Sequence, residues 1–106
     1  MNNNQKPNYR LVARISGHQL TISEDVGRQI ATCYDERIDE ICRRTKSAEE
    51  RARLVARELE HKGDFLADCG HSAAAARCYI KASQLLRHPS DIRRVMDKAE
   101  LCARRG

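Results

Sequence analysis

The segment Leu59–Ala82 reads LEHKGDFLADCGHSAAAARCYIKA, and its small residues stand where two packed helices would have to touch. Gly63, Gly70 and Ala75 alternate with bulkier residues such as Tyr79. Small side chains let two helix axes approach closely. The pattern therefore predicts a tightly packed antiparallel helical hairpin, and it contains no residue set that requires a catalytic function.

The composition favours one small helical domain. A chain of 106 residues has room for a single core, and 41% hydrophobic with 33% charged residues is typical of a folded protein rather than a disordered one. No run approaches the roughly 20 apolar residues of a membrane span, and the N-terminus lacks the apolar segment of a secretory signal. We therefore expect a cytoplasmic protein with no membrane partner.

Three regions differ in their patterning. Residues 1–8 are polar and are expected to form a disordered tail. Residues 9–22 contain two short alternating apolar runs around a Ser-Gly turn at 16–17, which predicts a β-hairpin. A lone hairpin is marginally stable in water, so it must pack on helices or pair with another chain. Residues 23–106 are expected to form a helical domain.

Four amphipathic helices are predicted in that domain. The first begins after Ser23 with an acidic first turn, and the second follows Ser47 in a capping box and ends near Cys69. The third spans about Ser72–Leu86, and the fourth follows a His-Pro break with Ser90 as its cap. The expected fold class is mainly α, a short N-terminal β-hairpin followed by four antiparallel helices.

About residues 56–88 resemble a single tetratricopeptide repeat. The residues at that family's signature spacings are Leu59, Gly63, Leu66, Gly70, Ala75, Tyr79 and Ala82. In the family, such residues let two helices approach closely, with one aromatic ring locking the crossing. The chain departs from the pattern at Lys62, where an apolar residue is usual, and at Pro89, which comes two residues late.

The resemblance implies a groove-lining face on the second predicted helix. That face would present Arg57, Glu60, Asp64, Ala67 and Asp68. Because it is mostly acidic, it would suit a basic or mixed-charge peptide. The implied function is non-catalytic protein–protein interaction, as an adaptor or small regulator. A solvated helix face without a partner is the alternative interpretation of the same residues.

Residues 11–60 resemble the start of the ZapA family of bacterial division proteins. The resemblance runs from Ile15–Ile22 through the first two predicted helices. Members of that family associate with the filament-forming tubulin homologue and oligomerise through a long coiled coil. Gly70 and Pro89 interrupt the region where this coiled coil would run. A division-associated homo-oligomer is therefore a further alternative.

Five cysteines are scattered without a pair at CxxC spacing, and they are Cys33, Cys42, Cys69, Cys78 and Cys102. Their odd number argues against a disulfide framework, so we expect small buried thiols in a reducing compartment. Cys69, His71 and Cys78 form the one cluster that invites a metal assignment. Zinc needs about four converging ligands, and these three flank a helix break, so no metal or cofactor is expected. Cys69 and His71 also lack an orienting third group, so we expect no enzyme.

The net charge of +5 is unevenly distributed. Residues 23–69 carry nine basic and twelve acidic residues, whereas residues 70–106 carry eight basic and three acidic residues. A basic C-terminal surface would contact phosphates, which makes a nucleic-acid-associated regulator the alternative function. Its cations would be Arg77, Lys81, Arg87, Arg93, Arg94, Lys98, Arg104 and Arg105.

Overall fold

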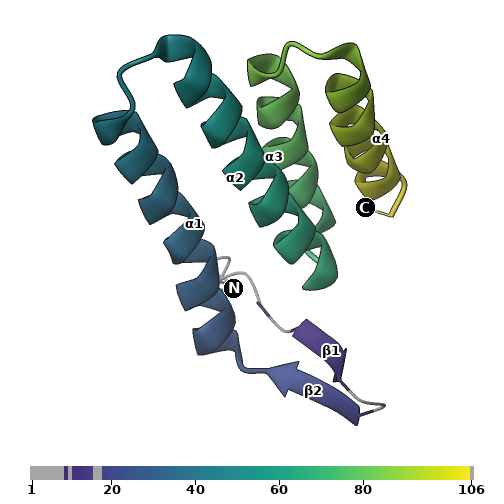
Figure 1. Cartoon of the computed structure of the whole chain (residues 1–106). Coiled ribbons are helices and arrows are strands. Elements are labelled where there is room, and N and C mark those ends of the chain that lie inside the picture. The colour runs from purple at the N-terminus through teal and green to yellow at the C-terminus, as the bar shows by residue number, and fades with distance from the viewer. Residues whose placement is uncertain (1–8, 10, 16–17, 106) are drawn as a thin grey trace, which may run out of the picture.

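The computed structural model describes residues 9, 11–15 and 18–105 (Figure 1). The predicted tail at residues 1–8 and the predicted turn at 16–17 lie outside these residues. The described chain is mainly helical, which confirms that part of the expected fold class. Its four helices are α1 (Glu24–Arg44), α2 (Ala48–Asp68), α3 (Ser72–Leu85) and α4 (Pro89–Arg105).

Two strands precede the helices. β1 (Leu11–Ile15) and β2 (His18–Ile22) pair in antiparallel orientation, with Ala13 opposite Leu20. Figure 1 shows the strands near the end of the helices opposite the α1–α2 and α3–α4 connections. The backbone of Tyr9 lies so close to Gly27 that a Cβ at Gly27 would overlap the Tyr9 carbonyl oxygen.

Serine caps fix the starts of the first two helices. The Ser23 hydroxyl accepts a hydrogen bond from the Val26 backbone N–H at 3.3 Å, and the Ser47 hydroxyl accepts one from the Glu50 N–H at 3.2 Å. Each cap satisfies a backbone donor that has no partner inside the helix, and two acidic residues follow in each first turn. Both starts agree with the sequence prediction.

The start of α4 differs from the prediction. The helix begins at Pro89, so the expectation that Ser90 would cap it is wrong. The Ile92 N–H already donates to the His88 carbonyl oxygen at 3.0 Å. Proline suits the first helical position because its missing N–H would have no helical partner and its ring fixes φ near the helical value.

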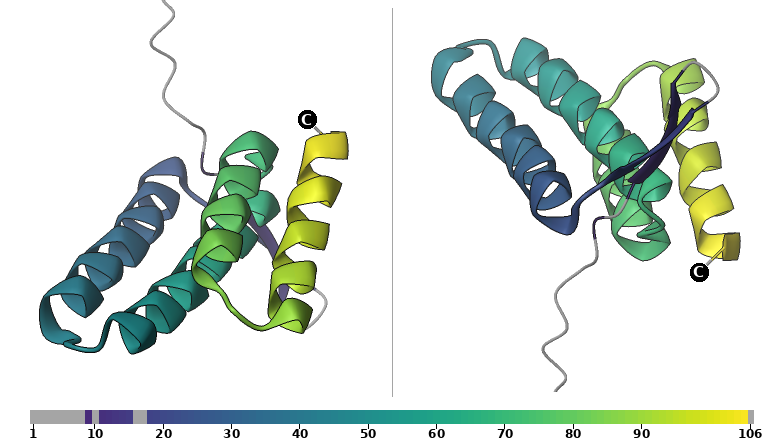
Figure 2. Two further views of the ribbon diagram at one scale, coloured as in Figure 1. Left: turned by 90° about the horizontal axis from the view of Figure 1, so that it is seen from above. Right: turned by 90° about the horizontal axis from the view of Figure 1, so that it is seen from below.

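The helices contact one another mainly in chain order, α1 with α2, α2 with α3, and α3 with α4. Figure 1 shows the chain direction alternating from one helix to the next, and Figure 2 shows the same row from above and below. The row leaves α1 and α4 at its two ends, each with one principal helical neighbour. Large parts of both helices are consequently open to solvent.

The core lies where α2, α3 and α4 meet, and alanine supplies much of it. Its buried members are Ala56, Leu66, Ala75, Cys78, Tyr79, Ala82, Val95, Ala99 and Cys102. Cys78 and Cys102 are buried as predicted, but Cys33 and Cys42 are exposed, so the expectation for those two thiols is wrong. Both lie on α1, which packs mainly on one neighbour and cannot bury a broad stripe.

Gly63 determines how closely α2 and α3 approach. An ideal Cβ at this position would lie 2.7 Å from Cε1 of Tyr79, a distance that real Cβ atoms essentially never show. The Tyr79 side chain is only 3% exposed, and its hydroxyl is hydrogen-bonded at 2.6 Å to Asp64. The ring therefore has little room to withdraw. α2 ends five residues after Gly63, at Asp68, and Gly70 follows with a φ of 85°, which favours glycine.

Gly63→Ala is expected to lower the free energy of unfolding by about 1–3 kcal/mol, because the added methyl overpacks the contact with Tyr79. In a Tyr79→Leu background the clash is removed, and the same change should be neutral or stabilising by up to about 1 kcal/mol through helix propensity. Chemical denaturation of the four proteins in this double-mutant cycle measures the coupling. Equal effects of Gly63→Ala in both backgrounds would contradict the assigned contact.

Candidate functional site

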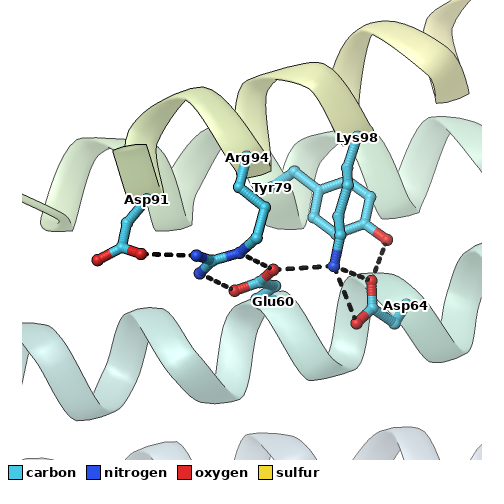
Figure 3. Close-up of polar contacts among 6 residues, drawn as sticks. All are labelled: Glu60, Asp64, Tyr79, Asp91, Arg94 and Lys98. Atoms are coloured by element: carbon cyan, nitrogen blue, oxygen red, sulfur yellow. Dashed lines mark hydrogen bonds and ion pairs between the residues drawn. The ribbon is translucent and has the colours of Figure 1, made fainter. Parts of the chain in front are cut away.

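Glu60 and Asp64, two of the predicted binding residues, lie in a polar network between α2 and α4 (Figure 3). The Arg94 guanidinium donates to both carboxylate oxygens of Glu60, at 2.7 and 2.9 Å. The Lys98 ammonium donates to Glu60 Oε2 at 2.8 Å and to Asp64 Oδ1 at 3.1 Å. Both acids are therefore neutralised by cations of α4 rather than left free in a groove.

Two more side chains extend this arrangement. The Tyr79 hydroxyl donates to Asp64 Oδ1 at 2.6 Å, and the Lys98 ammonium lies 5.8 Å from the centre of the Tyr79 ring. Asp91 accepts a hydrogen bond from Arg94 at 2.6 Å. We call this set the α2–α4 network, and its members are Glu60, Asp64, Tyr79, Asp91, Arg94 and Lys98.

The network shifts the pKa values of its buried members. Hydrogen bonds from Arg94 are the main reason that the pKa of Glu60 falls from its ordinary 4.5 to about 2, since burial acts in the opposite direction and Lys98 adds a smaller lowering. Burial and the hydrogen bond to Asp64 raise the pKa of Tyr79. Near neutral pH the Glu60 carboxylate stays charged and the Tyr79 phenol stays protonated. The charged Glu60 can therefore pair with the cations of α4, and the protonated Tyr79 of α3 can donate to Asp64 of α2.

The other two predicted binding residues have a different environment. Arg57 and Asp68 are exposed on the same face of α2 and form no ion pair within the described part of the chain. Of the four predicted residues, Glu60 and Asp64 are thus the two that form ion pairs with another described helix. Sequence reasoning assigned their partners to a basic surface and missed the pairing. The usable signal was the matching spacing of four residues in both the acidic and the basic pair.

The predicted basic surface has fewer unpaired cations than the sequence implied. Half of its eight cations are held in ion pairs, namely Arg87 with Glu49, Arg94 and Lys98 with α2 acids, and Arg104 with Glu100. Within residues 18–105, Arg77, Lys81, Arg93 and Arg105 form no ion pair. Fewer charges therefore remain free for phosphates than a count along the chain indicates.

An open hollow of about 700 Å³ lies where the start of α2 meets the end of α3 and the start of α4. Apolar side chains line part of it, and they are Ala48, Ala52, Leu85 and Leu86. Charged and polar residues complete the lining, and they are Ser47, Glu49, Glu50, Arg53, Arg87, His88 and Asp91. Leu85, near the end of α3, is 36% exposed and lines this hollow.

The cysteine–histidine cluster is dispersed in the structure. The His71 ring packs against the Tyr9 ring with centres 4.9 Å apart, Cys69 is half-buried, and Cys78 is buried in the core. Among the residues that the structure describes, no group of three or more His, Cys, Asp and Glu side chains is arranged to hold a metal ion. Burial raises the pKa of the Cys69, Cys78 and Cys102 thiols, which disfavours the reactive thiolate.

No protein-family model, curated protein or solved structure matches this chain. Among the described helices, none combines the length and apolar character needed to pass through a bilayer.

Glu60→Gln is expected to reduce the free energy of unfolding at neutral pH by about 2 kcal/mol, after allowing for the solvent exposure of Arg94. Because the folded pKa of Glu60 is depressed, its contribution is fully present above pH 4.5 and is lost as the pH falls toward about 2. The stability difference between wild type and Glu60→Gln should therefore shrink over that interval, as measured by denaturation at several pH values.

Glu100→Gln is the matched control, because this exposed carboxylate pairs with Arg104 on its own helix and with no other residue that the structure describes. It should change stability little at any pH. A pH-independent difference between Glu60→Gln and wild type would contradict the role assigned to the ion pairs.

Proposed function

We propose that the chain is a non-catalytic protein–protein interaction adaptor, and that it binds a partner segment at the hollow beside Leu85. The observation that supports this most directly is the hollow itself, with a volume of about 700 Å³ and an apolar wall. Pockets of about 300–1,000 Å³ with apolar walls and a few polar groups are typical ligand sites. One or two apolar side chains of a partner peptide would fit such a space.

The rim of the hollow supports a mixed-charge peptide as the partner. Glu49 pairs with Arg87 across the hollow, and Glu50 pairs with Arg53 at 3.5 Å. All four side chains are more than half exposed. Exposed pairs of this kind are worth only about 0–1 kcal/mol, so they exchange readily for charges on a partner. A peptide with an apolar anchor flanked by both signs of charge matches this rim.

We further propose that α2 and α3 form a tetratricopeptide-like unit, with α4 in the place of the first helix of a following repeat. The support is a constant offset in two of the three ion pairs between α2 and α4, since Glu60–Arg94 and Asp64–Lys98 both join residues 34 positions apart. Tetratricopeptide repeats have a period of about 34 residues. A constant offset also means that α2 and α4 run side by side in the same direction. The network then holds the scaffold, and the hollow provides the binding surface.

Affinity capture from a nuclease-treated extract of cells that naturally produce the protein tests the adaptor function. We expect wild type to retain a protein that Leu85→Asp loses, because a charge at this position opposes an apolar anchor. Ala48→Trp should lose the same protein by filling the hollow from the exposed start of α2. Leu101→Asp is the control, since Leu101 is 49% exposed on α4 and does not line the hollow.

Retention of the same protein by all four forms would contradict the hollow as the binding site. A wild-type protein that retains nothing after nuclease treatment would contradict the adaptor function and favour nucleic-acid association. Circular dichroism of each variant checks that the helices are intact.

A further inference from the structure

The side of α3 that points away from the core has an unusual combination of residues. We call it the α3 outer face, and its members are Ala73, Arg77, Ile80, Lys81 and Gln84, all of them exposed. Their spacing of three and four residues places them along one side of the helix. The buried residues of α3 occupy the opposite side, against α2 and α4.

This face is positively charged. Arg77 and Lys81 lie one turn apart, and neither forms an ion pair with another described residue. The helix itself, SAAAARCYIKASQL, contains no acidic residue. The neighbouring cation, Lys62 of α2, is neutralised at 2.7 Å by Asp35 of α1. The two uncompensated charges of the face are therefore those of Arg77 and Lys81.

The surroundings of Cys78 agree with this charge balance. Burial raises the pKa of this thiol, and the nearby charges that act on it are Lys62, Lys81, Asp35 and Arg77. Three of these groups are cationic and one is anionic. The one anion, Asp35, is already paired with Lys62.

A large apolar side chain lies beside Arg77 on the same face of the helix. Ile80 is 42% exposed, and it lies three residues after Arg77 and one before Lys81. A phosphate backbone has no apolar surface to place against Ile80, whereas an amphipathic helix offers an apolar stripe bordered by charge. The pairing of a free isoleucine with free cations therefore favours a protein helix over a nucleic acid.

We infer that the α3 outer face docks an acidic amphipathic helix of a partner protein. The apolar stripe of that helix covers Ile80, and its carboxylates pair with Arg77 and Lys81. This surface is separate from the hollow beside Leu85, so the inference goes beyond the proposed function and stands or falls independently of it.

The test uses the full chain and a fluorescent synthetic peptide with leucines along one helical face and glutamates elsewhere. Titration followed by fluorescence anisotropy should detect binding that weakens as salt is added. The double variant Arg77→Glu/Lys81→Glu should weaken binding ~10-fold or more, because two attractions become repulsions. Ile80→Ser should also weaken binding ~10-fold by removing the apolar contact.

Lys46→Glu/Arg105→Glu is the control, because it changes the net charge equally at two exposed cations off the α3 outer face. It should leave the affinity within ~2-fold of wild type, since distant exposed charges are largely screened. Ala48→Trp should have no effect on peptide binding, which separates this inference from the hollow. Helix content by circular dichroism confirms that each variant is folded.

Three results would overturn the inference. The first is equal affinity of wild type and both α3 variants for the acidic peptide. The second is equal binding of a matched peptide with lysines in place of glutamates. The third is binding of a short duplex DNA that is lost on charge reversal but unaffected by Ile80→Ser, with no binding of the acidic peptide, which would assign the face to nucleic acid.

Discussion

The contact between the backbone at Gly63 and the ring of Tyr79 determines how the last three helices are arranged. Because no Cβ intervenes, the ring can lie close to the α2 backbone, and its hydroxyl reaches Asp64 at 2.6 Å. The same carboxylate, together with Glu60, then receives Lys98 from α4. The absence of a side chain at Gly63 thus links the apolar packing of α2 and α3 to the ion pairs that join α4 to α2.

Many of the charged side chains of this protein pair with one another, and the remaining charges are exposed at its surface. Residues 23–69 carry nine basic and twelve acidic groups, a balance of −3, while residues 70–106 carry eight and three, a balance of +5. The α2–α4 network joins these two regions through Glu60, Asp64 and their cationic partners. Part of the positive excess that remains lies on α3, at Arg77 and Lys81, and this remainder is available to another molecule.

Sequence reasoning predicted the features that depend on neighbouring residues. The starts of α1 and α2 follow from Ser23 and Ser47, since each serine hydroxyl and the backbone N–H that donates to it lie within one turn. The close packing of α2 and α3 also follows from Gly63, because small residues at helical spacing allow two helices to approach closely. The start of α4 was missed because a proline in a sequence can mark either the end of one helix or the beginning of the next. Here Pro89 begins α4.

Features that join distant parts of the chain could not be predicted from such local patterns. The partners of Glu60 and Asp64 lie 34 or 38 positions away, and nothing local distinguishes them from other exposed cations. The hollow beside Leu85 exists only because two helix connections meet at one end of the row. The row itself has a kinetic consequence: when successive helices pair in order, most native contacts close short loops, and the entropic cost of each closure is small. Such low contact order is typical of rapid folding, in which the chain can assemble pair by pair as it leaves the ribosome.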